Sequence, residues 1–448
     1  MNDYAGKLYV VAGLGKTGLS AVRFLRRQGA RVRATDTRAE PPMLAALRRD
    51  YPEVEFVSGL PESALEGASA VVSSPGLDLR LPFFTAAGMR GLPVFGDIEL
   101  FARTLRAREA VPVVAITGSN GKSTVTTLVG EMARKAGRRV AVGGNLGTPA
   151  LDLLDDAVEL YVLELSSFQL ELTESLDASA AVVLNLSPDH IDRHGTLEHY
   201  AALKARIYRG RGHCVINRDD PRVTAMTPAG RPVTGFSLQP PQGDDDYGLV
   251  QAHDEIWLAR GGERLLPLSA LRIRGLHNAA NALAALALGE AVQLPRAAML
   301  AALREFPGLP HRCQWVAERR GVNWYNDSKG TNVGATLAAL TGMPGPIVLL
   351  AGGLAKGGDF APLKPVLADK GRALVLFGQD AMLIERAVSG ALPVYHAPDL
   401  DQAVQRAADV AQPGDTVLLS PACASFDMFS GYEQRGERFM AAVRGLPA

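Results

Sequence analysis

The chain is short of cysteine, of net charge and of long apolar runs. Its 448 residues include three cysteines, at the widely spaced positions 214, 313 and 423. This spacing favours neither a disulfide framework nor a zinc site built from paired cysteines. Lysine plus arginine and aspartate plus glutamate both number 47, so the formal net charge is zero. No overall positive field would therefore attract nucleic acid.

Membrane-spanning segments are also missing. The alanine- and leucine-rich stretch after Asn281 already ends at Gly289 and Glu290, too early to cross a bilayer. The N-terminus lacks the charged start, the long apolar stretch and the cleavage site of a signal peptide. With 47% hydrophobic and 21% charged residues, the composition is that of a soluble globular protein. We expect a cytoplasmic monomer without nucleic-acid or membrane partners.

What is present is an alternation of short β-rich runs with helical stretches, which predicts an α/β fold with parallel sheets covered by helices. Breaks near Gly91–Pro93 and Glu305–Pro310 divide the chain into a Rossmann-like domain (1–95), a central P-loop ATPase-like domain with a parallel sheet (96–306) and a Rossmann-like α/β domain (307–448). The turn-rich stretch 227–264 predicts short antiparallel strands at the end of the middle domain. Predicted strands include Leu8–Ala12, Val113–Thr117, Leu160–Leu165, Ala181–Leu186 and Ala373–Gly378.

A first glycine loop, Gly13–Gly18, has the pattern G-x-G-x-x-G between a predicted strand and a predicted helix. Asp36 stands at the end of the next predicted strand, 18 residues after Gly18. Glycines there let a diphosphate approach the backbone, and the acid can accept a hydrogen bond from a ribose or base. The loop predicts a nucleotide or dinucleotide and leaves an NAD-dependent oxidoreductase open, although nothing downstream supports hydride chemistry.

A second glycine loop, Gly118–Thr124, also joins a predicted strand to a helix. Two residues separate Gly118 from Gly121, where the standard P-loop has four. Its backbone N–H groups can cradle phosphate, Lys122 can reach the outer phosphates, and the hydroxyl of Ser123 or Thr124 can bind Mg²⁺. The loop predicts a nucleoside triphosphate. With two phosphate loops, one nucleotide is expected to be the phosphoryl donor and the other a part of the substrate.

Residues Thr117–Thr124 resemble the ATP loop of the Mur ligases, the amide-forming enzymes of peptidoglycan precursor synthesis. Four more segments resemble this family in the same order along the chain: Glu164–Gln169, Asn185–His194, His277–Leu283 and Asn326–Asn332. Near the C-terminus, Ser420–Asp427 resembles the family member that adds D-glutamate. The resemblance covers essentially the whole chain, and it implies three domains that bind a UDP-sugar, ATP and an amino acid.

The implied reaction is the ATP-dependent addition of D-glutamate to UDP-N-acetylmuramoyl-L-alanine through an acyl phosphate, with release of ADP and phosphate. Both partners of the phosphoryl transfer are anions, so metal ions and lysines must neutralise them. Alternatives remain: another Mur ligase, a folylpolyglutamate-type ligase, an NAD-dependent oxidoreductase or a non-catalytic nucleotide-binding regulator. The Asp-Asn-Pro-Arg segment of the diamino-acid-adding Mur ligases is absent.

Two Mg²⁺ sites, with Mn²⁺ as an alternative ion, follow from the resemblance. Ser123 and Glu164 would hold one ion, and His190 with a carbamylated Lys204 would hold the other. A carbamate gives a carboxylate-like ligand, and it forms on a neutral lysine, which burial near a metal can provide. The implied catalytic residues are Lys122, Glu164, His190, Lys204 and Lys329.

The resemblance also implies the binding residues for each substrate. For ATP they are Gly118, Ser119, Asn120, Gly121, Lys122, Ser123, Thr124, Asn278, Asn281, Arg312 and Asp327. For the UDP part of the acceptor they are Lys16, Thr17, Asp36, Thr37, Arg38, Ser74 and Gly76, together with Asn145 from the middle domain. For D-glutamate they are Thr331, Lys356, Ser425 and Phe426. The chain has 9 lysines against 38 arginines, and five of the nine lie in these predicted sites.

Overall fold

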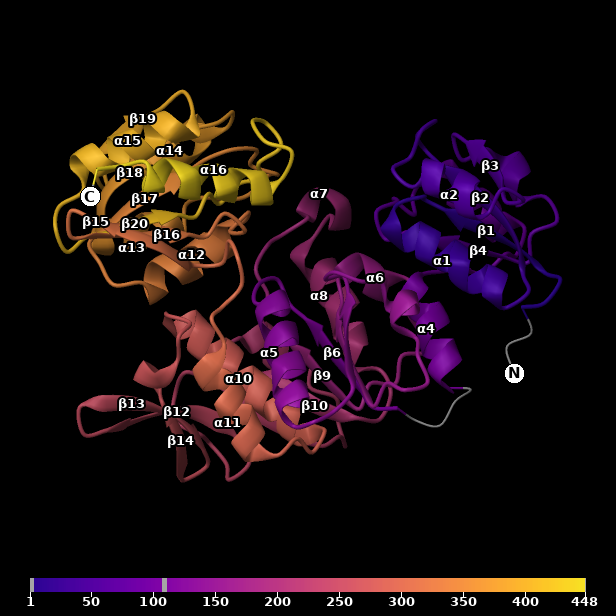
Figure 1. Cartoon of the computed structure of the whole chain (residues 1–448), viewed down its shortest axis with the longest axis horizontal. Helices are drawn as coiled ribbons and strands as arrows, with labels where there is room; N and C mark the ends of the chain where they lie inside the picture. Colours follow the sequence, from indigo (N-terminus) through magenta and orange to yellow (C-terminus); the bar gives the residue numbers. More distant parts are fainter. Residues whose placement is uncertain (1–3, 107–110, 448) are drawn as a thin grey trace.

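The computed structural model describes residues 4–106 and 111–447. Three sheets follow one another along the chain, and helices cover them (Figure 1). Most neighbouring strands in all three sheets are parallel, which confirms the predicted α/β class. No helix within the described residues is long and apolar enough to cross a membrane.

The first sheet is entirely parallel and has the order β3-β2-β1-β4-β5. Its strands are β1 (Leu8–Ala12), β2 (Arg31–Asp36), β3 (Glu55–Ser58), β4 (Ala70–Ser73) and β5 (Val94–Phe95). Its helices are α1 (Lys16–Arg27), α2 (Leu44–Asp50) and α3 (Pro82–Met89), with a 3₁₀ turn η1 (Glu62–Leu65). The strand order reverses between β1 and β4, so the loops after these two strands leave a crevice suited to a ligand.

The central sheet has nine strands in the order β14-β13-β12-β11-β10-β9-β6-β8-β7. They are β6 (Val113–Thr117), β7 (Val140–Gly144), β8 (Leu160–Glu164), β9 (Ala180–Val183), β10 (His213–Asn217), β11 (Val233–Phe236), β12 (Tyr247–Ala252), β13 (Glu255–Arg260) and β14 (Glu263–Pro267). The sheet is parallel from β7 to β12, whereas β12, β13 and β14 pair antiparallel. The antiparallel strands predicted in the turn-rich stretch are therefore present.

Helices cover both faces of the central sheet. They are α4 (Asp97–Arg106), α5 (Lys122–Lys135), α6 (Ser167–Glu171), α7 (Ile191–His194), α8 (Leu197–Ala205), α9 (Pro221–Thr224), α10 (Leu276–Ala291) and α11 (Arg296–Glu305), with 3₁₀ turns η2 (Ala150–Leu153), η3 (Arg206–Tyr208) and η4 (Leu268–Ala270). Leu128 of α5 and Leu283 of α10 share one core cluster with the buried β6 side chains Val114 and Ile116. This packing fixes the start of α5 directly after β6.

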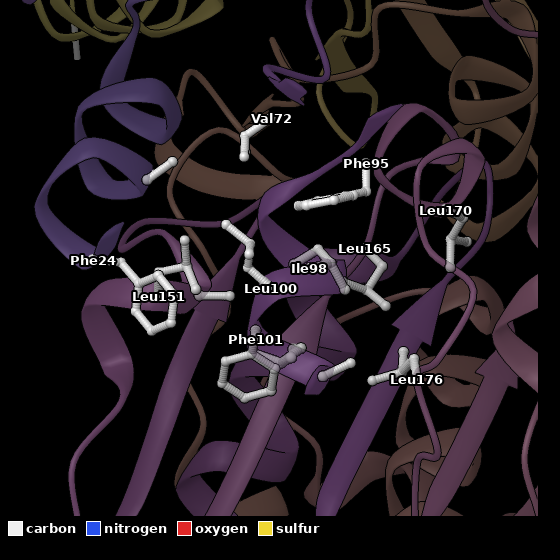
Figure 2. Packing of buried hydrophobic residues seen from close by; sticks show 14 of the residues in the cluster. Phe24, Val72, Phe95, Ile98, Leu100, Phe101, Leu151, Leu165, Leu170 and Leu176 are labelled. Carbon is white, nitrogen blue, oxygen red and sulfur yellow. The ribbon is translucent and has the colours of Figure 1, made fainter. Parts of the chain in front are cut away.

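Helix α4 packs between the first and the central domain. Its residues Ile98, Leu100 and Phe101 share a buried cluster with Phe24 of α1 and Leu151 of η2 (Figure 2). The Phe101 ring meets the Tyr161 ring edge-on at 5.1 Å between centroids. These apolar contacts attach the first domain to the central sheet. The domain boundaries predicted at 95/96 and 306/307 stay predictions.

The third sheet has the order β15-β16-β20-β17-β18-β19, with β15 antiparallel to β16 and the other pairs parallel. Its strands are β15 (Gln314–Arg319), β16 (Val322–Asn326), β17 (Ile347–Ala351), β18 (Gly371–Leu376), β19 (Val394–His396) and β20 (Thr416–Leu419). Its helices are α12 (Val333–Gly342), α13 (Leu363–Lys370), α14 (Ala381–Val388), α15 (Leu400–Val410) and α16 (Tyr432–Arg444). The loops after β16, β17 and β20 leave adjacent strands at the same edge.

The predicted strands Leu8–Ala12 and Val113–Thr117 are confirmed at both ends. The strand predicted to end at Leu165 ends at Glu164, and the one predicted over 373–378 covers Gly371–Leu376. The strand predicted to run to Leu186 ends at Val183. After Val183 the chain remains apolar but leaves the regular strand: the Leu184 N–H still donates to the Thr117 carbonyl, and the Asn185 carbonyl accepts from the Ser119 N–H in the second glycine loop.

Candidate functional site

The second glycine loop forms a cradle at the start of α5. Gly118 and Gly121 have φ of 150° and 85°, and a Cβ on Gly121 would lie 2.4 Å from Asn281 Oδ1. Glycine is therefore required at position 121. The loop is held by Asn185, whose carbonyl accepts from the Ser119 N–H at 2.9 Å and whose side-chain Oδ1 accepts from the Asn120 N–H at 2.8 Å. The backbone is thus preformed at the N-terminus of a long helix, where phosphate binds well.

Two adjoining cavities meet at this loop. The smaller, of about 200 Å³, is lined by predicted ATP residues that include Asn278, Asn281 and Asp327. The larger, of about 860 Å³, is lined by predicted catalytic and D-glutamate residues: Lys122, Ser123, Glu164, His190, Lys329, Thr331, Lys356, Ser425 and Phe426. Asn120, Gly121, Arg312 and Lys329 line both cavities. The central and third domains therefore enclose one composite site.

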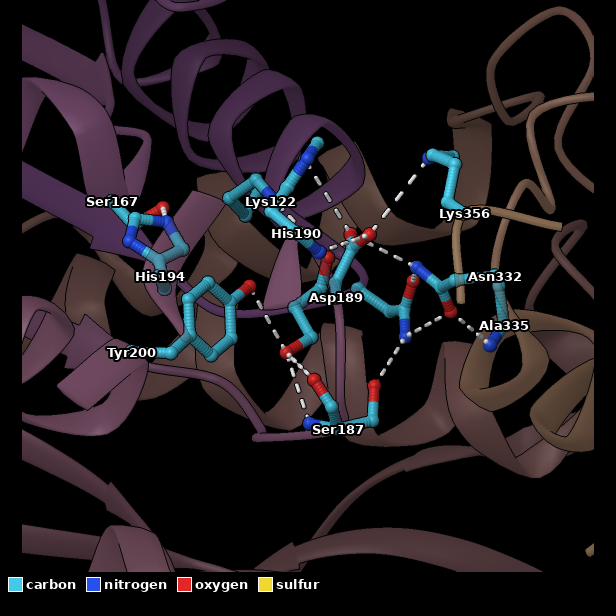
Figure 3. Close-up of polar contacts among 12 residues, drawn as sticks. Lys122, Ser167, Ser187, Asp189, His190, His194, Tyr200, Asn332, Ala335 and Lys356 are labelled. Atoms are coloured by element: carbon cyan, nitrogen blue, oxygen red, sulfur yellow. Dashed lines mark hydrogen bonds and ion pairs between the residues drawn. The ribbon is translucent and has the colours of Figure 1, made fainter. Parts of the chain in front are cut away.

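Direct hydrogen bonds join the third domain to the loop. Arg312 donates to Ser123 Oγ at 2.8 Å. Asn332, at the N-cap of α12, donates to Asn120 Oδ1 at 3.3 Å and to Asp189 Oδ2 at 3.2 Å (Figure 3). The nucleotide loop is therefore completed by a neighbouring domain.

Two lysines, the half-buried Lys122 and the buried Lys204, donate to the loop. Lys122 Nζ donates to the carbonyls of Gly118 and Ser119 at 2.8 and 2.9 Å. Lys204, 1% exposed, donates to the Gly118 carbonyl at 2.9 Å and to Thr117 Oγ1 at 3.2 Å. Burial lowers the pKa of Lys122, and burial together with the charge of Lys122 lowers the pKa of Lys204 well below its ordinary value. This shift favours the neutral amine, which is the form that carbamylation would need.

Glu164 and Ser123 offer oxygen atoms to a hard cation. Glu164 Oε1 accepts from Asn145 Nδ2 at 2.6 Å, while its buried Oε2 has no hydrogen-bond partner among the described residues. A carboxylate oxygen without a partner and a hydroxyl that line the same cavity are ligand types that suit Mg²⁺. Within residues 4–106 and 111–447, no three His, Cys, Asp or Glu side chains gather as a metal site. The fit for Mg²⁺ therefore rests on Glu164 and Ser123.

The third domain adds a buried acid and a lysine. Asp327 accepts from Ser420 Oγ at 2.7 Å and from the Cys313 N–H at 3.2 Å, and burial raises its pKa to about 6. Lys329 Nζ lies 3.6 Å from the centre of the Tyr432 ring. Burial, followed by the nearby charge of Arg312, lowers the pKa of Lys329 to about 8. Lys329 is therefore still largely charged at neutral pH.

The predicted D-glutamate residues lie on three loops of the third domain. Thr331 follows β16, Lys356 follows β17, and Ser425 and Phe426 follow β20. Ser425 is buried, whereas Phe426 is 71% exposed. Lys356 Nζ lies 3.8 Å from Asp189 Oδ1 of the central domain. These four residues share the larger cavity, but their role in binding D-glutamate stays a prediction.

The first glycine loop lies outside both cavities, as do the predicted UDP residues of its domain: Lys16, Thr17, Asp36, Thr37, Arg38, Ser74 and Gly76. Asp36, the predicted acceptor for a ribose or base, accepts here from the Leu14 N–H at 2.7 Å and from Arg38 Nε at 2.8 Å, so it also organises the loop. Its role towards a nucleotide stays a prediction. A Cβ on Gly13 would lie 2.6 Å from the Ser74 Cβ, which keeps the loops after β1 and β4 in contact. Asn145 lies apart from this set, beside Glu164.

Several residues of the site were not predicted. Asp189 and Asn332 lie inside two of the family-like segments, Asn185–His194 and Asn326–Asn332. A polar side chain within such a segment is the one sequence signal that could have marked them as site residues. Tyr432 lies under Lys329 although the two residues are far apart in the sequence, and His277 lines the smaller cavity. Tyr200 contacts Ser119 Oγ at 3.3 Å through its hydroxyl. Only the folded chain brings these aromatic groups to the loop.

Comparison with known proteins now adds to this geometry. Family models match most of the chain: the Mur ligase MurD-like N-terminal domain at residues 7–96, the Mur ligase middle domain at 116–289 and the Mur ligase glutamate ligase domain at 311–423. A protein of Nitrosococcus oceani named UDP-N-acetylmuramoylalanine--D-glutamate ligase is 55% identical over 98% of this chain and 96% of its own length. A protein of the same name from Pseudomonas putida is 54% identical, over 98% and 97%.

Solved structures share the fold at low identity. A pseudomurein peptide ligase type C from Methanothermus fervidus has a TM-score of 0.63 and 17% identity, over 98% of this chain and 100% of that one. The MurF ligase of Thermotoga maritima, solved in complex with ADP, has a TM-score of 0.62 and 18% identity, over 99% and 96%. The predicted three-domain fold is confirmed. Since three family models together match well over half of the sequence and full-length relatives exceed 50% identity, the chain belongs to the Mur ligase family.

Proposed function

We propose that the protein is an ATP-dependent ligase that joins D-glutamate to UDP-N-acetylmuramoyl-L-alanine in peptidoglycan precursor synthesis, releasing ADP and phosphate. The shared name of the full-length relatives supports this reaction. One structural observation carries it: the phosphate loop and the Lys356 loop, from different domains, line the same cavity. We further propose that the protein acts in the cytoplasm as a monomer.

The reaction has two steps. A carboxylate oxygen of the acceptor attacks the γ-phosphorus of ATP, the bond to the β-phosphate oxygen breaks, and ADP leaves. The neutral amine of D-glutamate then attacks the carbonyl carbon of the acyl phosphate. Phosphate leaves, and the new C–N nitrogen releases one proton, which gives the amide. The first step brings two anions together, so it depends on positive charge placed beforehand around the phosphates.

Three cations of this chain surround the phosphate loop. Lys122 and Lys329 line the larger cavity, and Arg312 contacts Ser123 from the third domain. In the free protein the Lys122 ammonium is held by loop carbonyls, and we infer that it turns to the phosphates when ATP binds. Asn278, Asn281 and Asp327 would contact the nucleoside in the smaller cavity. Because the binding residues come from two domains, closure would couple nucleotide binding to assembly of the site.

Glu164 and Ser123 would hold Mg²⁺, which supplies additional positive charge to the phosphates when it is bound. A second ion on His190 and a carbamylated Lys204, and use of Mn²⁺, are parts of the same proposal. Its support is the buried Lys204 amine, whose pKa is lowered by burial. The first-domain residues around β1 and β4, together with Asn145, would bind the uridine diphosphate part of the acceptor.

The test supplies ATP, Mg²⁺ and UDP-N-acetylmuramoyl-L-alanine and measures ADP release while the amino acid is varied. D-glutamate is expected to trigger ADP release, and L-glutamate and D-alanine are the matched comparisons. If ADP release did not depend on D-glutamate, that result would contradict ligase activity towards D-glutamate. A clear preference for another amino acid would contradict the assigned specificity and leave the ligase class standing.

A further inference from the structure

Asp189 is a cavity carboxylate to which the proposed reaction has assigned no role. It stands two residues before α7, and its side chain is 14% exposed. Asp189 Oδ1 accepts from the His190 N–H at 3.1 Å, and Oδ2 accepts from Asn332 Nδ2 at 3.2 Å (Figure 3). These two hydrogen bonds, one from each domain, fix the carboxylate at the domain junction.

Lys356 faces this carboxylate across the cavity. Its Nζ lies 3.8 Å from Asp189 Oδ1, and its side chain is 30% exposed. This separation is too long for a direct hydrogen bond, so the two groups form a loose ion pair. An ammonium group has three donors and a carboxylate about four acceptor positions, so both groups can take a further partner.

An amino acid is a zwitterion and needs an anion as well as cations in its binding site. Three carboxylates line the larger cavity: Glu164, Asp189 and Glu433. Glu164 is held by Asn145 near the phosphate loop, and Glu433 is exposed in the first turn of α16. Asp189 is the carboxylate of these three that forms an ion pair with a predicted D-glutamate residue.

We propose that Asp189 binds the ammonium group of the incoming D-glutamate while Lys356 binds one of its carboxylates, so that the amino acid inserts into the existing ion pair. This inference rests on the proposed function. Each protein charge then exchanges one partner for another, and neither is left buried and unpaired. The ammonium would enter beside Asn332, which also contacts the phosphate loop through Asn120. Asp189 would thus distinguish an amino acid from a plain dicarboxylate.

The test compares D-glutamate with glutarate, the five-carbon dicarboxylate without the amino group. Calorimetry measures the Kd of each on the full chain loaded with MgADP and UDP-N-acetylmuramoyl-L-alanine. The parent protein is expected to bind D-glutamate about 10- to 100-fold more tightly than glutarate, and Asp189→Asn to lose most of that preference. The control variant Asp192→Asn removes an exposed carboxylate from nearby α7, and it is expected to keep the preference for D-glutamate over glutarate.

Retention of the preference in Asp189→Asn would overturn the inference. Equal weakening of both ligands would overturn it as well, because that result indicates a purely structural role. MgADP binding checks that the variant is folded, and Asp189→Ser replaces it if the check fails. Equal affinity of the parent for the two ligands also contradicts the inference, with no variant needed. Failure of the proposed function is distinct, since the parent would then release no ADP on addition of D-glutamate.

Discussion

The two glycine loops follow buried parallel strands, yet they are held in different ways. The first loop, Gly13–Gly18, is fixed within its own domain, because Asp36 accepts from the Leu14 N–H. The second loop, Gly118–Thr124, is contacted by Arg312 and Asn332 from the third domain. In Figure 1 the first and third domains lie apart, with the central domain between them along the chain.

The first loop is therefore a binding site formed within one domain, whereas the second loop is completed by contact with another domain. Ligand binding at the first loop should depend on the first domain itself. Binding at the second loop should depend on both the central and the third domain, because residues of both line the cavities. Variants of matched residue types in the two loops can therefore break or sharpen the comparison.

The largest difference is expected between Lys122→Met and Lys16→Met. Lys122 is half-buried in the second loop and lines the larger cavity, so its loss should lower kcat by about 10²- to 10³-fold. Lys16 is exposed and outside both cavities, so Lys16→Met should leave the KM for ATP unchanged and raise the KM for the uridine substrate. Initial rates with each substrate varied measure both effects. If Lys16→Met changed the KM for ATP more than the KM for the uridine substrate, the assignment of the two loops would be reversed.

Asp36→Asn tests whether the first loop is fixed from within. Burial alone would raise the pKa of Asp36, but hydrogen bonds from Arg38 and the Leu14 N–H outweigh it and hold the pKa at about 2. A lowered pKa stabilises the fold above the ordinary value near 4, and this contribution is lost as pH falls towards 2. Asp36→Asn should lower the free energy of unfolding by about 2 kcal/mol at pH 7, and by less at pH 3.

Urea unfolding at the two pH values measures this difference. Glu40→Gln, which changes an exposed acid in the segment after β2, is the control and should change the free energy of unfolding by less than about 0.5 kcal/mol. An Asp36→Asn effect that is the same at pH 3 and pH 7 would show that the charge of Asp36 does not hold the loop.

Arg312→Lys tests the contact between domains at the second loop. The planar guanidinium reaches Ser123 Oγ at 2.8 Å, and a lysine cannot reproduce this geometry. The KM for ATP should rise about tenfold. Arg38→Lys, the corresponding change beside the first loop, should leave it unaltered. Equal shifts in both variants would mean that the two loops do not bind separate ligands.

The smallest effect concerns pH. Because burial and Arg312 lower the pKa of Lys329 to about 8, its positive charge is lost as pH rises from 7 to 9. The KM for ATP should therefore rise about fivefold over this range. Lys329→Arg stays charged and should flatten the profile, while the KM for the uridine substrate should show no such dependence on Lys329. A profile unchanged by Lys329→Arg would assign the titration to another group.

The strands under both loops could be predicted because each is a continuous buried apolar run, as in Val113–Thr117. The end of the strand at Val183 could not, since the leucines that follow suggest a longer strand, while Asn185 contacts the second glycine loop through its side chain. Asn120 and Asn332 are 212 residues apart, and no local pattern pairs them. Asp36 has the expected position at the end of a strand, but only the folded chain shows that its oxygens accept from the Leu14 N–H and from Arg38.

One measurement tests most directly whether the two loops bind different nucleotides. Hydrogen exchange of the full chain is followed with MgADP alone and with UDP alone. MgADP should slow exchange at residues 118–124 and around Asn332, and leave residues 13–18 unchanged. UDP should slow exchange at 13–18 and leave 118–124 unchanged. Protection of the first loop by MgADP, or of the second by UDP, would contradict the account.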